Sequence, residues 1–290
     1  MNQVSPPTLP DWILLDPMLT RWLQEDIGRG DVTTQALGLS EHHLGKAELV
    51  FKQAGCVTGL SLFERVFALL SDQVQLTSAV AEGERCSAGT VVASLQGPMA
   101  PLLKGERVAL NLIMRLSGIA TLTQEYVDAI ATLPTQLVDT RKTTPGLRLL
   151  EKYATRVGGA KNHRLGLDDA VMLKDNHIQA AGGVGAAIDQ VRHQIPFPLA
   201  IEVETETLEQ VQEALAHDVD IIMLDNMAPA QMQAAVQNIR AHNTKIKIEA
   251  SGNITLATIR AVADTGVDYI STSAPITQSP WLDISLRVIS

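Results

Sequence analysis

Aromatic residues, cysteines and long apolar runs are all scarce in this sequence. Trp, Tyr and Phe make up 3% of its 290 residues, so aliphatic and alanine side chains have to fill the core. Cys56 and Cys86 have no cysteine or histidine partners at metal spacing, which excludes a disulfide framework and a cysteine metal motif. No run approaches the roughly 18 apolar residues of a membrane span. The polar start, Met1 to Trp12, lacks a basic stretch followed by an apolar core, so we expect no secretory signal and a cytoplasmic protein.

An excess of positive charge is also missing, since the chain carries a net charge of −9. Proteins that coat nucleic acid or anionic membranes need a broad positive face, so we expect neither partner. Residues 141–174 depart from this balance with eight basic side chains against three acidic ones, a net +5 that leaves −14 for the rest. The eight are Arg141, Lys142, Arg148, Lys152, Arg156, Lys161, Arg164 and Lys174. Clustered Arg and Lys usually bind phosphate or carboxylate, and we predict a small, multiply anionic ligand.

The first 132 residues combine helices with short β-rich segments. Helical spacing of apolar residues predicts helices at about 13–27, 60–70, 103–117 and 121–132, and β-rich runs lie at 46–52, 74–79 and 90–96. Glycine turns separate these runs. This part of the chain therefore predicts a small, sandwich-like α+β domain.

A repeated strand–helix pattern follows. Six short apolar runs end in polar or charged residues, at about 137–138, 170–173, 199–201, 221–224, 246–248 and 267–270, and helical patterns occupy about 184–195, 205–217, 228–241 and 254–265. Strands that alternate with helices indicate a parallel sheet, and runs that are apolar on both faces indicate that helices cover it. We predict an α/β fold with an incomplete barrel of the TIM type; an open doubly wound sheet is the alternative.

Functional side chains of such barrels lie at the carboxyl ends of the strands. The candidates there are Arg141, Lys142, Lys174, Glu202, Glu204, Asp225, Ser251-Gly252-Asn253 and Thr272-Ser273-Ala274. The cations suit an anionic substrate, and the carboxylates suit sugar hydroxyls, a Mg²⁺ shell or a developing positive charge. The small residues near the last two strands suit a phosphate group.

Several of these signals have a second reading. Lys174 is either a Schiff-base lysine or a plain cation for the substrate. Lys152 and Arg156 share one face of a helix expected to start near Thr144-Pro145, and that face is equally consistent with a solvated surface. His163, beside Arg164, is a candidate carboxylate donor. Two decoys are rejected: the glycines at 182–185 follow no strand, and His42-His43 lacks further metal ligands.

Taken together, the motifs resemble the quinolinate phosphoribosyltransferase family. The matching stretches are 25–33, 105–111, 116–121, 139–148, 159–164, 173–177, 202–204, 224–226 and 249–253. The resemblance implies that quinolinate and phosphoribosyl pyrophosphate give nicotinate mononucleotide, pyrophosphate and CO₂ with Mg²⁺, in de novo NAD biosynthesis. It also implies an N-terminal domain (1–117), a barrel domain (118–277) and a final segment (278–290) that returns to the first domain. Family members form homodimers or hexamers of dimers, with active sites shared between subunits.

The resemblance also implies roles for single residues. Arg107 would come from the neighbouring subunit, and Arg141, His163, Arg164 and Lys174 would hold the two carboxylates of quinolinate. Phosphoribosyl pyrophosphate would be held by Lys142, Glu204, Asp225, Ser251, Gly252 and Asn253, with Lys142, Glu204 and Asp225 catalytic and the two acids indirect Mg²⁺ ligands. Thr140 would also bind substrate. Thr272, Ser273 and Ala274 would form a variant phosphate loop, because many members have glycine in place of Ser273 and leucine in place of Pro275.

Two other functions are open at this point. The first is a Schiff-base lyase that uses Lys174 or Lys142. The second is a non-catalytic paralogue that keeps the anion pocket for binding or transport-linked regulation. A complete set of cations and carboxylates disfavours the second function, since a binding protein does not need both.

Overall fold

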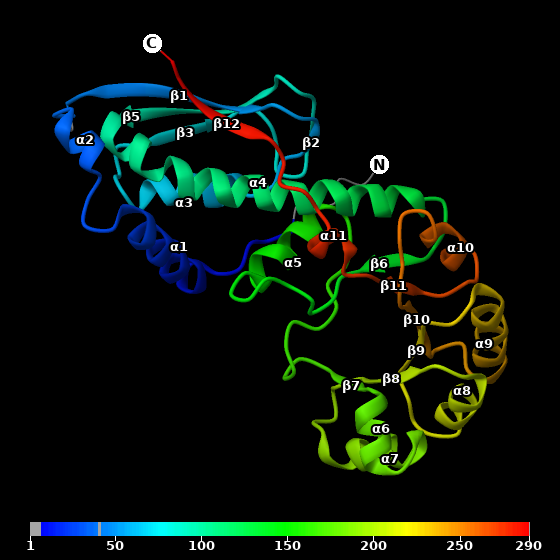
Figure 1. Cartoon of the computed structure of the whole chain (residues 1–290). Helices are drawn as coiled ribbons and strands as arrows, with labels where there is room; N and C mark the ends of the chain where they lie inside the picture. The colour runs from blue at the N-terminus through cyan, green and yellow to red at the C-terminus, as the bar shows by residue number, and fades with distance from the viewer. Residues whose placement is uncertain (1–6, 40–41, 290) are drawn as a thin grey trace. The chain divides into compact units, whose positions relative to one another are not determined.

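The computed structural model describes residues 7–39 and 42–289, and the chain divides into two compact units (Figure 1). Unit 1 contains residues 1–124, 149–158 and 279–290, and unit 2 contains 125–148 and 159–278. The expectation of no secretory signal falls partly on residues 1–6, which lie outside the described residues. Among the described helices, none combines the length and the hydropathy that crossing a membrane requires.

Unit 1 is built on a four-stranded antiparallel sheet in the order β12-β1-β5-β3, with a second sheet of β2 and β4. In Figure 1, α3 and the unit 1 part of α4 lie on one face of the larger sheet. The elements are α1 (Trp12–Ile27), α2 (Val32–Ala36), β1 (Leu44–Phe51), β2 (Gly55–Cys56), α3 (Leu60–Ala68), β3 (Gln75–Ser78), β4 (Arg85–Cys86), β5 (Val91–Pro98), α4 (Met99–Ala129, which continues into unit 2), α5 (Arg148–Val157) and β12 (Ile284–Ile289).

The first helix follows directly from its sequence. The Asp11 side chain accepts a hydrogen bond from the N–H of Ile13 and caps the helix, as short polar residues do at this position. Leu15, Leu19 and Leu23 recur at intervals of four and are all buried, so one face of α1 packs into the core. The expected helix at 13–27 is thereby confirmed.

The segment 149–158 belongs to unit 1, whereas the expected division placed it in the barrel domain. Glu151 is fully buried, and one of its oxygens lies 2.8 Å from Nη2 of Arg115. The Tyr153 hydroxyl donates to Glu82 at 2.9 Å, and burial raises the pKa of the Glu82 carboxyl. A buried carboxylate needs such partners, and these contacts tie α5 to unit 1.

Two expectations about α5 are corrected. The helix starts at Arg148 rather than at Pro145, because Gly146 adopts a left-handed conformation with φ of 82° and keeps the preceding residues in a turn. Lys152 is 1% exposed, so the solvated-surface reading is wrong for this residue. Arg156, by contrast, is exposed.

A single helix, α4, replaces the two helices expected at 103–117 and 121–132. Gly118 lies in its interior, where glycine normally costs about 1 kcal/mol relative to alanine. A Cβ at this position would lie 2.0 Å from the carbonyl oxygen of Pro280. The glycine therefore marks a close approach of another chain segment within unit 1 and does not end the helix.

Unit 2 contains six parallel strands in the order β6-β11-β10-β9-β8-β7. They are β6 (Gln136–Val138), β7 (Val171–Leu173), β8 (Ile201–Thr205), β9 (Ile221–Asp225), β10 (Lys247–Ser251) and β11 (Tyr269–Ser271). No ladder joins β6 to β7 among the described residues; instead Lys161 makes an isolated parallel bridge to Val138. The predicted incomplete barrel is confirmed.

Short helices connect these strands. They are α6 (Asp175–Ala181), α7 (Val184–Gln194), α8 (Leu208–Leu215), α9 (Pro229–His242), α10 (Ile259–Ala263) and α11 (Ala274–Thr277). The helices from α6 to α10 contact one another in chain order, and Figure 1 shows α8, α9 and α10 following one another outside the strands. The sequence did not predict α6, and α10 is shorter than the expected 254–265. The parallel strands direct all six carboxyl ends toward one end of the unit.

We expect Gly118→Ala to lower the free energy of unfolding by about 2 kcal/mol, although alanine favours helices, because the added methyl group would overpack against a backbone carbonyl. Thermal and urea unfolding would measure this change. Asn111→Ala is the matched control at an exposed position of the same helix, and it should be neutral or slightly stabilising. A stabilised Gly118→Ala protein would contradict the close approach.

Candidate active site

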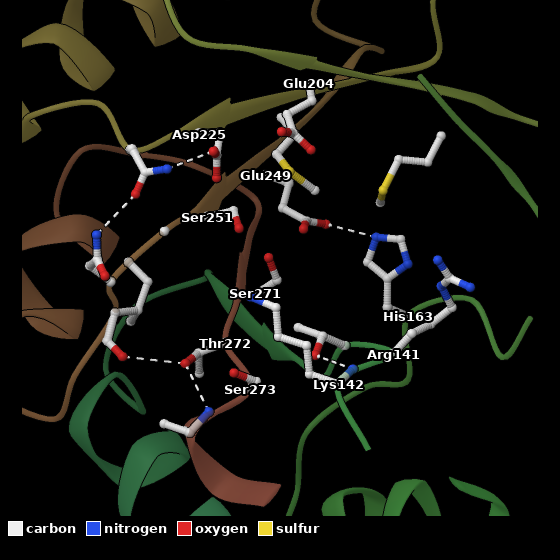
Figure 2. Close-up of a pocket in the computed structure, with 18 of the residues that line it drawn as sticks. Arg141, Lys142, His163, Glu204, Asp225, Glu249, Ser251, Ser271, Thr272 and Ser273 are labelled. Carbon is white, nitrogen blue, oxygen red and sulfur yellow. Dashed lines mark hydrogen bonds and ion pairs between the residues drawn. The ribbon is translucent and has the colours of Figure 1, made fainter. Parts of the chain in front are cut away.

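A pocket of about 760 Å³ opens at the carboxyl ends of the strands of unit 2, and Figure 2 shows side chains from several strand ends around it. Fourteen of the predicted site residues line the pocket: Thr140, Arg141, Lys142, His163, Arg164, Lys174, Glu204, Asp225, Ser251, Gly252, Asn253, Thr272, Ser273 and Ala274. Arg107 does not line it, since this residue lies in the part of α4 that belongs to unit 1. The pocket thus gathers residues that are up to 138 positions apart in sequence, from Thr140 to Gln278.

The cationic side of the pocket is formed by Arg141, Lys142, Arg148, Arg164 and Lys174. Arg164 is fixed by a hydrogen bond from its Nη1 to the carbonyl oxygen of Ala170, 2.9 Å away. Burial, together with the nearby positive charge of Arg141, lowers the pKa of the Arg164 guanidinium. Like charges held close together cost free energy until an anion binds between them. This arrangement is suited to a ligand with more than one negative charge.

Lys174 forms an ion pair with Glu204 from the neighbouring strand. The Nζ atom lies 2.5 Å from Oε2 of Glu204, and the backbone N–H of Lys174 donates to Nδ1 of His177 at 3.1 Å. A Schiff-base lysine needs a free Nζ to attack a carbonyl, whereas Nζ of Lys174 is engaged as a donor to the Glu204 carboxylate. The contact therefore supports the plain-cation reading of Lys174 over the Schiff-base reading.

Small polar residues also line the pocket. The Thr272 hydroxyl accepts from the N–H of Ala274 at 3.2 Å and donates to the carbonyl oxygen of Ile254 at 3.3 Å. The Thr140 hydroxyl accepts from the N–H of Lys142 at 3.1 Å. These contacts order the loops after β11 and β6, so that their backbone groups present a defined surface to a ligand.

Two buried glutamates hold the imidazole of His163. Its Nε2 lies 3.0 Å from Oε2 of Glu202 and 3.4 Å from Oε2 of Glu249, the second contact being dashed in Figure 2. The two glutamates are 2% and 3% exposed, and the Oε1 atom of each has no hydrogen-bond partner within the described chain. Asp139 fixes the main chain by accepting from the N–H of His163 at 2.9 Å.

This cluster has the spacing of a metal site, but its hydrogen bonds indicate a proton instead. The N–H of Arg164 donates to Nδ1 of His163 at 2.7 Å, so Nδ1 carries a lone pair and Nε2 carries the ring proton. A metal on Nε2 would require the opposite tautomer. Both ring nitrogens are therefore engaged, and direct donation from His163 to a substrate carboxylate would require the imidazole to leave one of these partners.

Burial alone would lower the pKa of His163, but Glu202 and Glu249 outweigh it and raise the pKa to about 10. For the Glu202 carboxyl, burial has the opposite effect and raises the pKa. The contact with His163 counteracts this rise, and the negative charge of Glu249 adds to it. His163 and Glu202 therefore hold a proton in common up to alkaline pH. Because Nδ1 already accepts a hydrogen bond, we place the additional proton on Glu202 rather than on the ring.

Sequence reasoning missed some pocket residues. These are Met172, Met223, Asn226, Glu249, Ile254, Ser271 and Gln278, and Arg148 was predicted only as a member of the basic cluster at 141–174. The alternation of side chains along a strand could have found Glu249, which lies two residues before Ser251 and so points to the same face. Asn226 and Arg148 lie in the stretches that match the family, at 224–226 and 139–148, but the resemblance assigned neither of them a role.

The pH dependence of stability tests the His163 cluster. Because the folded pKa of about 10 exceeds the usual value of 6.5, the contribution is complete below pH 6.5 and is lost as the pH rises through 10. We expect the free energy of unfolding to fall over this range by more in the wild type than in His163→Asn. Urea unfolding at several pH values would measure the difference. His193→Asn, at an exposed histidine of α7, should keep the wild-type slope, and equal slopes in all three proteins would contradict the assignment.

Comparisons with known proteins agree with this site. The family described as quinolinate phosphoribosyl transferase, C-terminal domain, matches residues 119–287, and its N-terminal domain matches residues 31–117. A probable nicotinate-nucleotide pyrophosphorylase [carboxylating] of Synechocystis sp. is 59% identical over 97% of this chain and 95% of its own length. Its counterpart in Bacillus subtilis is 45% identical over 94% of this chain and 93% of its own length.

Solved structures lead to the same family. The crystal structure of NadC from Streptococcus pyogenes has a TM-score of 0.92 and 42% sequence identity, and the match covers 98% of this chain and 100% of that one. Both family domains are thus present in order, and the relatives match over nearly the whole chain. The chain belongs to the quinolinate phosphoribosyltransferase family.

Proposed function

We propose that this enzyme transfers the phosphoribosyl group of phosphoribosyl pyrophosphate to the ring nitrogen of quinolinate and removes one carboxylate, in de novo NAD biosynthesis. The observation that carries the proposal is a single pocket that joins five basic side chains to Glu204 and Asp225. The first set suits a dicarboxylate and a pyrophosphate, and the second set suits a sugar on which positive charge develops. Few other reactions need both in one place.

The two carboxylates of quinolinate are assigned to the cationic side of the pocket. Arg141, Arg164 and Lys174 supply the charge there, and Arg164 is already held by Ala170. Guanidinium groups suit this task because they bind carboxylates with two parallel hydrogen bonds. His163 supports this side through the N–H of Arg164. We therefore expect nicotinate, which has one carboxylate fewer than quinolinate, to be a poor substrate.

Phosphoribosyl pyrophosphate is assigned to the remaining strand ends. Lys142 and the loops 251–253 and 272–274 would hold its phosphates, and Glu204 and Asp225 would face the ribose. The bond from the ring nitrogen to the anomeric carbon forms as the bond to pyrophosphate breaks. Positive charge then passes from the ribose to the ring, which accepts the electron pair left when the adjacent carboxylate leaves as CO₂. A proton from water completes the ring carbon.

Mg²⁺ is the proposed cofactor. Glu204 and Asp225 both line the pocket, and their carboxylate oxygens are the hard ligands that Mg²⁺ prefers, together with water and phosphate oxygens. When bound, the ion would neutralise charge that builds up on the leaving pyrophosphate. The two acids would act through water, since Glu204 already pairs with Lys174.

The assembly and location are also proposals. We propose a homodimer, or a hexamer of dimers, in which Arg107 of one subunit completes the pocket of another. The support is the family resemblance around Arg107, whose side chain is 60% exposed in the single chain. We place the enzyme in the cytoplasm, where a reducing environment suits two free and buried cysteines.

The reaction can be tested in one assay with quinolinate, phosphoribosyl pyrophosphate and Mg²⁺. We expect nicotinate mononucleotide and CO₂ in equal amounts, and no product when nicotinate replaces quinolinate. Binding of quinolinate without turnover would favour the non-catalytic paralogue. Trapping of substrate on a lysine by borohydride would favour the lyase instead.

The shared site can be tested by mixing two inactive variants. We expect Arg107→Ala and Lys174→Ala each to lower activity by about 100-fold or more, because each removes a charge that contacts an anionic substrate. After subunit exchange, the mixture should recover about a quarter of the wild-type activity, since half of the dimers are mixed and each mixed dimer holds one intact site. Lys245→Ala, at an exposed lysine, is the control. No recovery after verified exchange would contradict the shared site.

A further inference from the structure

Asn226 has an unusual backbone conformation next to the pocket. Asn226 and Asn253, with φ of 55° and 52°, are the two non-glycine residues with positive φ in the described part of the chain. Asparagine tolerates the left-handed region better than most residues, yet the conformation persists only where its surroundings stabilise it. The two asparagines follow β9 and β10, whose last residues, Asp225 and Ser251, are in register on neighbouring strands. The strained positions therefore lie on adjacent loops.

The side chain and backbone of Asn226 connect these two loops. Its Nδ2 donates to Oδ2 of Asp225 at 2.7 Å, and its Oδ1 accepts from Nδ2 of Asn253 at 3.1 Å. Its backbone N–H donates to the carbonyl oxygen of Ser251 at 3.0 Å. The side chain thus uses its amide group as a donor on one side and as an acceptor on the other. A rotated amide would turn its donor toward the donor of Asn253 and lose both contacts.

Gly252 packs against the same residue. A Cβ on Gly252 would lie 2.2 Å from Oδ1 of Asn226 and 2.9 Å from its backbone nitrogen. The glycine has a φ of 97°, a conformation that other residues rarely adopt. The loop 251–253 is therefore shaped around the Asn226 side chain and backbone. A substitution at position 226 would therefore alter contacts with all three residues of the loop 251–253.

We propose that Asn226 is a positioning residue for the half of the pocket that takes phosphoribosyl pyrophosphate. It orients the Asp225 carboxylate and holds the loop 251–253 in one arrangement, while its own side-chain polar atoms stay engaged with protein groups. Within the described chain, its hydrogen bonds join it to Asp225, Ser251 and Asn253, none of which belongs to the cationic side of the pocket that is assigned to quinolinate. This role rests on the proposed function, because it assigns the two loops to the ribose and its phosphates.

Two substitutions separate the contacts of Asn226. Asn226→Asp keeps an acceptor for Asn253 and tolerates the same backbone conformation, but it turns a carboxylate oxygen toward Asp225. Asn226→Gly keeps the backbone conformation and removes both side-chain contacts. Asn238→Asp makes the same amide-to-carboxylate change as Asn226→Asp, but at an exposed position of α9, and serves as the matched control. Thermal unfolding of each protein would show that it folds.

The test compares the two substrates with Mg²⁺ present. For both Asn226 variants we expect the KM for phosphoribosyl pyrophosphate to rise by about tenfold or more, as loss of charge-assisted hydrogen bonds would produce. The Kd of quinolinate for the free enzyme, measured by calorimetry, should stay within about twofold of the wild-type value. Asn238→Asp should match the wild type in both measurements. A general loss of stability would not raise the KM for phosphoribosyl pyrophosphate while leaving the Kd of quinolinate unchanged.

Three outcomes would overturn the proposal. An unchanged KM for phosphoribosyl pyrophosphate in Asn226→Gly would show that the connection between the loops is not needed. Equal loss of affinity for both substrates would show a general structural role. A wild-type protein that binds no phosphoribosyl pyrophosphate would overturn the proposed function first and this role with it, so the two failures are distinguishable.

Discussion

The register of the parallel strands is the constraint on which the pocket depends. Ser251 pairs with Asp225 and Thr205 pairs with Leu224, so the last residues of β8, β9 and β10 reach the same level of the sheet. Hydrogen bonds between buried strands fix this alignment, because a shift by one residue would turn every side chain to the other face. Glu204 and Asp225 line the same pocket for this reason, although 21 positions separate them in sequence.

Charge is balanced in layers within unit 2. The cations that line the pocket would repel one another in an empty site, and buried carboxylates lie among and beneath them. Glu204 pairs with Lys174, and Glu202 and Glu249 lie against His163. A partly exposed pair such as Lys174–Glu204 adds little to stability by itself, but it keeps polar groups in place for a ligand. The protein thus holds its positive groups ready while limiting their mutual repulsion.

Much of this architecture could be predicted from the sequence. The six strands, the incomplete barrel and pocket residues at strand ends such as Arg141, Lys174 and Asp225 followed from short apolar runs that end in polar residues. Periodicity could not reveal that α4 is continuous through Gly118, because the reason lies in a contact with Pro280, 162 positions later in the sequence. It also could not reveal that Lys152 is buried, or that Asn226 adopts a left-handed conformation. Each depends on neighbours that only the tertiary structure supplies.

The strand β12 has a consequence for the order of folding. It pairs with β1, and the register joins Lys46 to Ile289, so the larger sheet of unit 1 includes residues that are 243 positions apart in sequence. Contacts between such distant segments form slowly, because a long loop has to close first. The residues of unit 2 are synthesised in full before β12. During translation the barrel can therefore form while one edge of β1 is still unpaired, and an unpaired strand edge is a site at which aggregation can begin.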